Sequence, residues 1–378
     1  MLAHGEAVFP AAGGHVARDD TWQPDPDSDL EDGRAMNELL FAGEDLGQMR
    51  GWISAATEFV VGGALEAVEA RLANAGRGAV IRVLDYGAGT GLATIEFLKG
   101  CRRRGLEERV ARTGSTLEMH VVDRPNPWFA QGFTMLRDCS WTRFHSLRTA
   151  DGGFRPLLEA TGGRSMDAVM VANVFHLIPA RALGRAAADL ASAVKPGGRL
   201  TWCSPDLAPA GSNAVLFHDV NRAVRKRWVE ALTDEAKTSG KSGRSRSASP
   251  IVSEAAARVR ESLDPAARRD AQSRADAHIL PVPNQLEDVV TALEAHLSGH
   301  VERPTHETLD EELLKALLVP SIQAEYMAEI RDRSLREEVM RELMLADVLP
   351  EVEARGARTA RGVNVQWNFG SFVRGASG

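Results

Sequence analysis

The segment 79–100, AVIRVLDYGAGTGLATIEFLKG, constrains the fold of this chain more than any other. An apolar run ends in Asp85, three glycines follow at alternate positions (Gly87, Gly89 and Gly91), and the residues after them predict a helix. A strand, a glycine turn and a helix in this order form the nucleotide-binding end of doubly wound parallel sheets. Glycine suits the turn because it adopts positive φ without a Cβ penalty and lets a ligand approach the backbone closely. We therefore expect an α/β fold with a binding site at this turn.

The residues from Val83 to Gly91, VLDYGAGTG, resemble the first motif of the class I S-adenosylmethionine-dependent methyltransferases, an acidic residue followed by G-x-G-x-G. The dinucleotide fingerprint G-x-G-x-x-G instead requires a glycine at position 92, which is Leu92. The resemblance implies a doubly wound, mostly parallel seven-stranded sheet of the Rossmann-like type. It also implies an enzyme that binds S-adenosyl-L-methionine and forms S-adenosyl-L-homocysteine. The cofactor contacts implied along the motif fall on Asp85, Tyr86, Gly87, Ala88, Gly89 and Gly91.

Three later segments extend the resemblance in the expected order. LEMHVVD, 117–123, predicts a second strand that again ends in an acid. MDAVMVANVFHLIP, 166–179, begins as a continuous apolar strand and continues like the family's fourth motif. VKPGGRLTWCS, 194–204, has the Lys-Pro-Gly-Gly turn that often precedes the fifth strand of this family. The ordered set is far more specific than the glycine motif alone.

Asp123, at the end of the second predicted strand, can accept hydrogen bonds from both ribose hydroxyls of an adenosine ligand. Its separation from Gly91 exceeds the usual spacing of about 20 residues. An alternative is that Asp123 only caps the next helix, because Pro125 and Pro127 suit a helix start. Ribose binding and helix capping are both compatible with the sequence.

Two further cofactor contacts follow from the family's pattern. The family places an acidic or polar residue after the third strand, here 142–147, to contact adenine, and Asp151 is the nearest match. The turn chemistry of an Asp-Gly pair explains Asp151 equally well. Asn173, at the exit of the fourth strand, would contact the amino-acid part of the cofactor or the substrate.

Two histidines are candidates for a catalytic base. Methyl transfer from a sulfonium is a direct displacement, and an oxygen or nitrogen acceptor also loses a proton. His176 follows the fourth strand closely, and His218 lies after the fifth strand. The alternative for each is a structural or substrate-shaping histidine, because position in the sequence does not fix a role.

The chain outside the core divides by composition and pattern. The helices expected before the first strand would either cover the cofactor or pack on the sheet. The segment inserted after the fifth strand would form a lid that selects the substrate. Within the insertion we expect helices at 284–297 and 307–318, and the end of the chain predicts a helix at 337–355 followed by two strands around 368–370. The expected parts are a mobile tail at 1–34, N-terminal helices at 35–76, the methyltransferase core at 77–207, a helical insertion at 208–335 with a mobile loop at 237–250, and a closing helix and antiparallel strand pair at 336–378.

Composition limits the partners. Hydrophobic residues make up 44% and the formal net charge is −7, which favours a globular protein and weighs against nucleic acid as the main partner. The basic group 222–227 is either a solvated helix face or a site for an anionic partner. Three separated cysteines suggest no zinc or other metal site and fit the reducing cytoplasm. The sequence has no run of 18 apolar residues, so it predicts no membrane span. A homodimer is compatible with the sequence.

These observations predict methyl transfer to a small or medium organic molecule, with oxygen favoured over carbon or nitrogen as the acceptor atom. The setting we expect is bacterial secondary metabolism. Two alternatives remain, an NAD-type oxidoreductase and a methyltransferase-like binding protein without catalysis.

Overall fold

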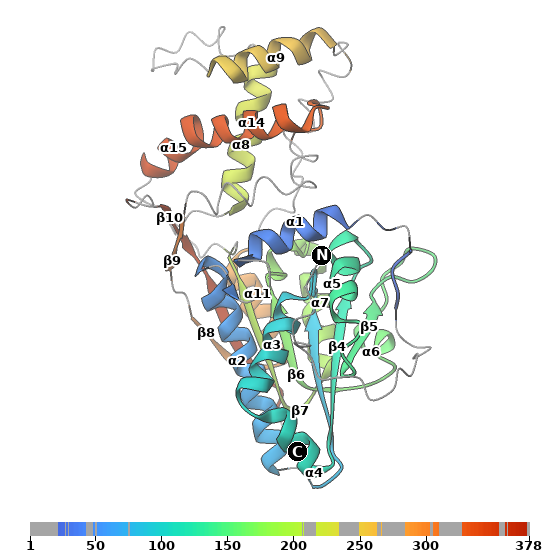
Figure 1. The fold of residues 1–378 in the computed structure, drawn as a ribbon. Coiled ribbons are helices and arrows are strands. Elements are labelled where there is room, and N and C mark those ends of the chain that lie inside the picture. The colour runs from blue at the N-terminus through green and yellow to red at the C-terminus, as the bar shows by residue number, and fades with distance from the viewer. Residues whose placement is uncertain are drawn as a thin grey trace. The chain divides into compact units, whose positions relative to one another are not determined.

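The computed structural model describes residues 22–26, 28, 30–42, 48–49, 51–74, 76–205, 207, 217–233, 249–262, 266, 284–302, 305–309, 327–354, 360 and 362–375. The chain forms two units (Figure 1). We call the first, Met1–Pro209 with Asn284–Pro304 and Trp367–Gly378, the sheet unit. We call the second, Ala210–Pro283 with Thr305–Gln366, the helical unit.

The sheet unit alternates strands and helices along most of its length. Its helices are α1 (Glu31–Leu40), α2 (Gly51–Asn74), α3 (Leu92–Arg103), α4 (Leu106–Thr113), α5 (Pro127–Leu136), α6 (Leu157–Ala160), the 3₁₀ helix η1 (Phe175–Leu177), α7 (Ala180–Ala193) and α11 (Leu286–Glu294). Its strands are β1 (Phe41–Ala42), β2 (Gln48–Met49), β3 (Val80–Tyr86), β4 (Thr116–Asp123), β5 (Thr142–Ser146), β6 (Met166–Ala172), β7 (Val194–Ser204), β8 (Ser298–Glu302) and β11 (Asn368–Val373).

Seven of these strands form one mixed sheet in the order β5-β4-β3-β6-β7-β11-β8. The neighbours from β5 to β7 are parallel, whereas β11 runs antiparallel to both β7 and β8. The order reverses between β3 and β6, and ligands of doubly wound sheets bind at such a point, beyond the carboxyl ends of the strands. The predicted doubly wound, mostly parallel seven-stranded sheet is confirmed.

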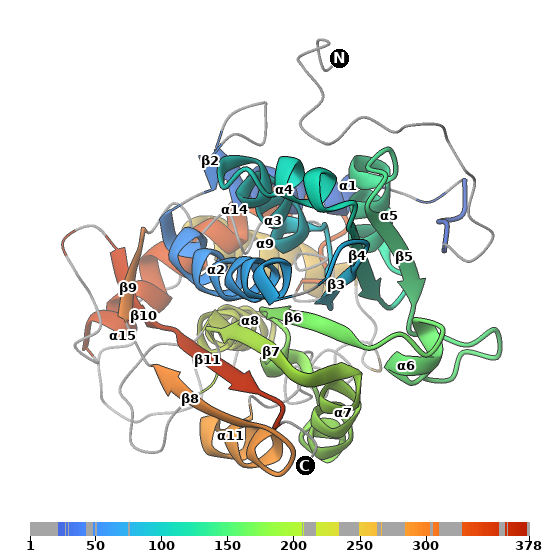
Figure 2. The ribbon, with the colours of Figure 1, turned by 90° about the horizontal axis from the view of Figure 1, so that it is seen from below.

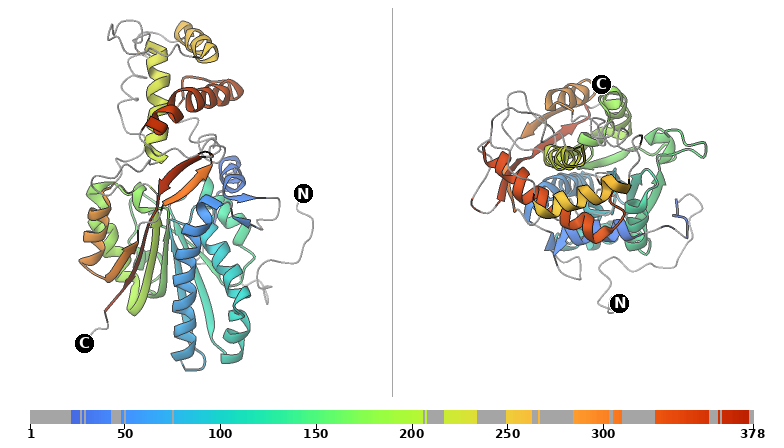
Figure 3. Two further views of the ribbon diagram at one scale, coloured as in Figure 1. Left: turned by 90° about the vertical axis from the view of Figure 1, so that its left-hand side faces the viewer. Right: turned by 90° about the horizontal axis from the view of Figure 1, so that it is seen from above.

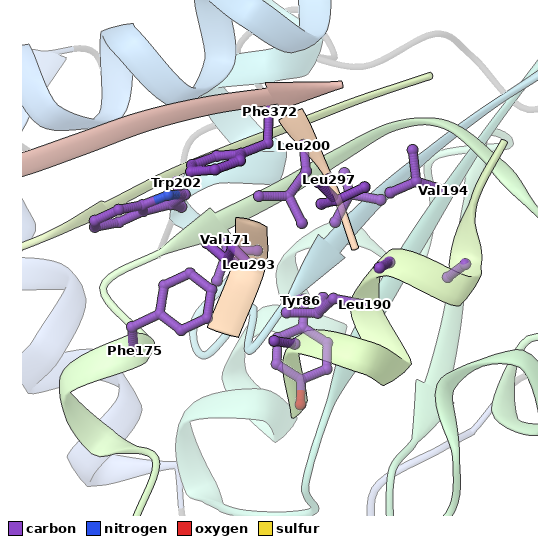
Figure 4. Close-up of a cluster of buried hydrophobic side chains, with 14 of the residues drawn as sticks. Tyr86, Val171, Phe175, Leu190, Val194, Leu200, Trp202, Leu293, Leu297 and Phe372 are labelled. Carbon is purple, nitrogen blue, oxygen red and sulfur yellow. The ribbon is translucent and has the colours of Figure 1, made fainter. Parts of the chain in front are cut away.

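Helices cover both faces of the sheet (Figure 2). Helices α2, α3 and α5 lie on one face, and α7 and α11 lie on the other. The second face holds an apolar cluster with Trp202 and Phe372 from the sheet and Leu190 and Leu293 from the helices (Figure 4). Because both faces are covered, β6 is buried along almost its whole length, which explains its continuous apolar sequence.

Helix α2 lies very close to β7. A Cβ atom on Gly63 would come within 2.4 Å of Cγ2 of Thr201, and the Thr201 hydroxyl donates a hydrogen bond of 2.8 Å to the Val60 carbonyl. Glycine inside a helix lowers its intrinsic stability. Here the missing side chain permits the close contact between helix and strand.

The N-terminal segment differs from the expected tail at 1–34. Residues 1–21 lie outside the described part, but the Trp22 ring stacks on Phe129 at 4.5 Å between ring centroids, and the backbone N–H of Trp22 donates to the Phe144 carbonyl at 2.7 Å. Helix α1 already begins at Glu31, and Gly33 allows it to pack closely on Gln131 of α5. The aromatic ring and the small residue hold this segment, although its acidic, proline-bearing composition is typical of a mobile tail.

The elements that complete the sheet also differ from the expectation. Both strands expected around 368–370 form, but they do not pair with each other, because β10 (Gly362–Gln366) pairs with β9 (Thr305–Leu309), whereas β11 pairs with β7 and β8. Helix α11, expected in the insertion, belongs to the sheet unit, and so does β8, a strand that the sequence did not predict. The expected closing helix at 337–355 belongs to the helical unit instead.

The helical unit contains four α-helices in its described residues, seen in two further views in Figure 3. They are α8 (Phe217–Thr233), α9 (Pro250–Ser262), α14 (Arg333–Leu343) and α15 (Leu349–Ala354), with a π-helical turn η3 (Met344–Val348) between the last two. A helix was expected at 307–318, but its first residues form part of strand β9, and residues 310–318 lie outside the described part. Residues 237–248 of the expected mobile loop also lie outside the described part.

One residue of the basic group at 222–227 is not solvated. Arg225 is buried and forms a bidentate ion pair with Glu329, at 2.7 and 2.9 Å. Trp228 donates to the same carboxylate at 3.1 Å. Arg225 therefore stabilises the helical unit internally, while Arg222 and Lys226 are exposed.

Candidate active site

The glycine turn follows β3 at the carboxyl edge of the sheet. Gly87, Gly89 and Gly91 all adopt positive φ, at 70°, 51° and 81°. A Cβ on Gly87 would come within 2.5 Å of Val174, and one on Gly91 within 2.7 Å of Leu136. At Gly89 an added Cβ would meet only a ring atom of one side chain at 3.9 Å, so space is open there. The turn is tightly packed at its ends and open at its middle glycine.

The side chains of Asp85 and Tyr86 are both buried in the sheet unit. Asp85 is buried, and its Oδ2 accepts hydrogen bonds from the backbone N–H of Thr94 at 3.1 Å and from the Thr94 hydroxyl at 2.7 Å. Burial raises the pKa of the Asp85 carboxyl to about 7, although the Thr94 hydrogen bonds act in the opposite direction. The Tyr86 ring lies in the apolar cluster near Leu190 (Figure 4), and burial raises its pKa to about 12. Cofactor contact by either residue stays a prediction.

Ala88 contributes its backbone to the turn. Its N–H and that of Gly87 both donate to the Val122 carbonyl, at 3.2 and 2.8 Å, and its own carbonyl accepts from Gly91 at 2.8 Å. These bonds attach the turn to the end of β4.

Asp123 contacts the glycine turn directly. Its Oδ2 accepts a hydrogen bond of 2.7 Å from the Gly89 N–H, and its Oδ1 accepts one of 2.6 Å from the Arg124 N–H. Burial raises the pKa of this carboxyl, against the effect of the two backbone donors. A carboxylate offers about four lone-pair positions, so acceptor capacity remains for hydroxyl groups. The helix-cap alternative is wrong, because Asn126 caps α5 by accepting from Phe129 N–H at 2.9 Å.

Helix α5 forms a wall of the site that the sequence did not indicate. Trp128 is the side chain nearest the open side of Gly89, with its Cε3 atom 3.9 Å from the added Cβ position. A Cβ on Gly132 would lie 2.9 Å from the Gly89 carbonyl oxygen, so α5 packs directly on the turn. Only the proximity of RPNPWF to Asp123 in the sequence could have suggested Trp128.

The exit of β6 lies against the glycine turn through the contact between Val174 and Gly87. Asn173 has φ of 61° and is the one non-glycine residue with positive φ among the described residues. Its N–H donates to the Cys203 carbonyl at 2.9 Å. Asparagine tolerates this conformation better than most residues, and such strain often occurs at functional sites.

His176 lies in η1, three residues beyond Asn173. Its Nδ1 is 2.9 Å from the hydroxyl oxygen of Ser204, the last residue of β7. The structure thus brings the glycine turn, Asp123, Asn173 and His176 to neighbouring strand ends of one sheet edge.

The other two predicted site residues are Asp151, in a turn of the sheet unit, and His218, in the helical unit. Asp151 is exposed and accepts hydrogen bonds within its own turn, from the Thr149 hydroxyl and from the Gly153 N–H. Its local bonds are those of the turn alternative, and adenine contact stays a prediction. His218 lies in α8 of the helical unit, so its role as a base also stays a prediction.

Neither metal ligation nor a membrane span is indicated in the described part of the chain. Among those residues, no group of three or more His, Cys, Asp and Glu side chains could hold a metal ion. None of the described helices is long and apolar enough to cross a membrane.

The strand order β5-β4-β3-β6-β7-β11-β8, with β11 antiparallel to both of its neighbours, identifies the fold together with the comparison to solved structures. Loganic acid methyltransferase, solved with S-adenosylhomocysteine, aligns with a TM-score of 0.50 at 14% identity, over 89% of this chain and 99% of that one. The chain has the fold of the class I methyltransferases. No protein-family model and no curated protein matches its sequence.

Two other solved methyltransferases align with this chain at lower TM-scores. Phosphoethanolamine N-methyltransferase 2 of Haemonchus contortus, in complex with S-adenosyl-L-methionine, gives a TM-score of 0.36 at 13% identity, covering 85% of this chain. The chain spans 56% of that enzyme's length. N-methyltransferase NodS of Bradyrhizobium japonicum, solved with S-adenosylhomocysteine, gives a TM-score of 0.36 at 14% identity, over 75% of this chain and 94% of that one.

Proposed function

We propose that this chain is an S-adenosyl-L-methionine-dependent methyltransferase that acts on a small or medium organic molecule. The main support is the hydrogen bond between the Asp123 carboxylate and the Gly89 N–H. This bond holds a carboxylate, which can accept from hydroxyl groups, beside the open middle of a left-handed glycine turn. These residues fit an adenosine ligand, with Asp123 as the proposed acceptor for the ribose hydroxyls and Trp128 as an aromatic wall.

The bound cofactor would supply an electrophilic methyl group on a sulfonium. The chain's own residues would then position the acceptor, exclude water and receive the proton that an oxygen or nitrogen acceptor loses. His176 is the candidate base in the sheet unit, and its loop contacts Gly87 through Val174. We favour an oxygen acceptor, and the loganic acid methyltransferase that shares the fold is named for an organic acid.

The setting we propose is bacterial secondary metabolism in the cytoplasm, with a small-molecule acceptor and with the helical unit contributing to its selection. The net charge of −7 and the internal pairing of Arg225 support a small molecule over nucleic acid. A homodimer is compatible with this proposal.

Calorimetric titration tests the cofactor. We expect S-adenosylhomocysteine to bind and NAD to give no heat. Asp123→Ala should weaken S-adenosylhomocysteine binding by about 1–3 kcal/mol, because the ribose hydroxyls and the Gly89 N–H lose their acceptor. Asp123→Asn keeps one acceptor oxygen and should lose less affinity.

Two results would contradict the proposal. Tight binding of NAD without binding of S-adenosylhomocysteine would replace it with an oxidoreductase. An unchanged dissociation constant in Asp123→Ala would remove Asp123 from the site. Turnover of labelled S-adenosyl-L-methionine against a metabolite library then distinguishes an enzyme from a binding protein that has lost catalysis.

A further inference from the structure

The short helix η1 lies next to the glycine turn of the proposed cofactor site. Val174, which precedes it, occupies the space that a Cβ on Gly87 would need, at 2.5 Å. Phe175 is completely buried and meets the Trp202 ring edge-on, with 5.3 Å between the ring centroids. The N–H of Leu177 donates to the Val174 carbonyl at 2.8 Å, which closes the turn. The position of η1 therefore determines how Val174 packs on the glycine turn.

Asn284 binds η1 at both of its ends. Its Nδ2 donates to the carbonyl of Phe175 at 2.9 Å and to that of Ile178 at 2.8 Å. Because carbonyl oxygens only accept hydrogen bonds, these two bonds fix the orientation of the amide. Asn284 is 2% exposed, so removal of its side chain would take this donor from two carbonyls where water does not replace it. One side chain from a distant part of the chain thus clamps the turn.

Asn284 is also the residue at which the chain re-enters the sheet unit. It directly follows the segment Ala210–Pro283, which belongs to the helical unit. Two residues later α11 begins at Leu286, whose side chain is buried in the same apolar cluster as Phe175. The amide of Asn284 therefore ties the re-entry point of the chain to the turn that packs on the glycine motif.

We propose that Asn284 is a positioning residue that holds η1 against the glycine turn and couples cofactor binding to the re-entry point of the chain. It acts through Val174 on Gly87 and touches neither the cofactor nor the acceptor. A cofactor bound at the glycine turn stabilises η1, and the two amide bonds extend this stabilisation to residues 284–290. The inference rests on the proposed S-adenosyl-L-methionine-dependent function.

Calorimetric titration with S-adenosylhomocysteine provides the first readout. We expect Asn284→Ala to weaken binding by about 3- to 10-fold, because the turn loses the donor that holds both of its ends. Asn284→Asp keeps the shape of the side chain, but its carboxyl donates one hydrogen when protonated and none when ionised. The affinity of this variant should therefore fall with rising pH more steeply than that of the parent.

Arg374→Ala is the matched control for the loss of a clamp. Arg374 donates from Nη1 to three carbonyls where α7 ends and β7 begins, those of Ala191, Ser192 and Val194. This variant should lose stability in thermal unfolding, as Asn284→Ala should, but its affinity for S-adenosylhomocysteine should stay within twofold of the parent. A merely structural role for Asn284 predicts the same pattern for both variants.

Hydrogen exchange followed by mass spectrometry provides the second readout. Saturating S-adenosylhomocysteine should slow amide exchange in peptides covering 284–290 of the parent by about threefold or more, and Asn284→Ala should abolish this difference. Strand β8 is the internal control, because it pairs with β11 and should exchange equally with and without the ligand. A purely structural asparagine would speed exchange in both states and leave the ligand-induced difference intact.

Three results would overturn the inference alone: an unchanged affinity in Asn284→Ala, no protection of 284–290 in the parent, or protection that survives the substitution. Asn284→Ser keeps one donor and replaces the alanine variant if that variant does not fold, and its affinity should be intermediate. A parent that binds no S-adenosylhomocysteine would overturn the proposed function and the coupling with it.

Discussion

The buried carboxyl of Asp85 makes a specific prediction about stability. Its pKa is about 7 in the folded chain and 3.8 in the reference state, because burial disfavours the charged form. A folded-state pKa above the unfolded one gives stability that is fully present below the unfolded value and is lost as pH rises to the folded value. The shift of about three units corresponds to about 4 kcal/mol at 1.36 kcal/mol per unit.

Asp85→Asn tests this reasoning because the amide oxygen can still accept from the Thr94 N–H and hydroxyl without a charge. We expect the variant to gain stability relative to the parent at pH 8. At pH 5, where nearly all of the folded carboxyl is protonated, we expect this gain to be about 2–3 kcal/mol smaller. Urea unfolding of both proteins, followed by circular dichroism from pH 5 to pH 8, measures the difference. A difference between variant and parent that does not change with pH would refute the argument.

Asp167→Asn is the matched control for this experiment. Asp167 is also a buried carboxyl on a central strand, but it accepts from Lys195 at 2.6 Å and from the Arg82 N–H at 2.8 Å, and Arg71 lies 3.3 Å away. Its replacement removes the partner of two cations. The control should therefore lose stability at pH 8, whereas Asp85→Asn should gain it.

Three further predictions concern the stability of the folded chain. Burial lowers the pKa of His120, so the folded chain should lose stability as pH falls below about 6.5, and His120→Gln should flatten that slope in urea titrations. Arg225→Ala leaves buried Glu329 without its bidentate partner and should lower stability by about 3–5 kcal/mol in thermal unfolding, with partial recovery on adding Glu329→Gln. Gly63→Ala should destabilise by about 1–3 kcal/mol through its clash with β7, whereas Gly62→Ala meets no atom within 4 Å and should stabilise by about 0.5–1 kcal/mol. Equal effects of the two alanines in the same unfolding assay would contradict the packing argument.

The glycine turn and Asp123 could be predicted because their geometry follows from local rules. Alternate glycines at the end of an apolar strand permit positive φ, and a carboxylate at the end of the neighbouring parallel strand meets them at the same edge. The confirmed strands β4, β6 and β7 have sequences whose apolar runs match their burial.

The remaining elements depend on contacts between distant segments. Most residues of β8 are exposed, so this edge strand has no apolar alternation that a sequence pattern could reveal. Asn284 and Asn368 act through single buried amides, for which no periodic signal exists. Gly63 weakens a helix by propensity but permits its packing on β7, and only the folded structure shows which effect dominates.

The insertion of β11 between β7 and β8 has a consequence for the nascent chain. Strand β8 pairs in the sheet only with β11, which comes later in the sequence, and β7 has β11 as its outer neighbour. Until β11 is synthesised, the edge of β7 lacks its partner and Trp202 lacks the cover of Phe372. An unpaired apolar edge invites pairing with other chains. Truncation before residue 368 should therefore produce aggregation rather than a smaller soluble protein, and chaperone demand should be greatest in the interval before β11 is synthesised.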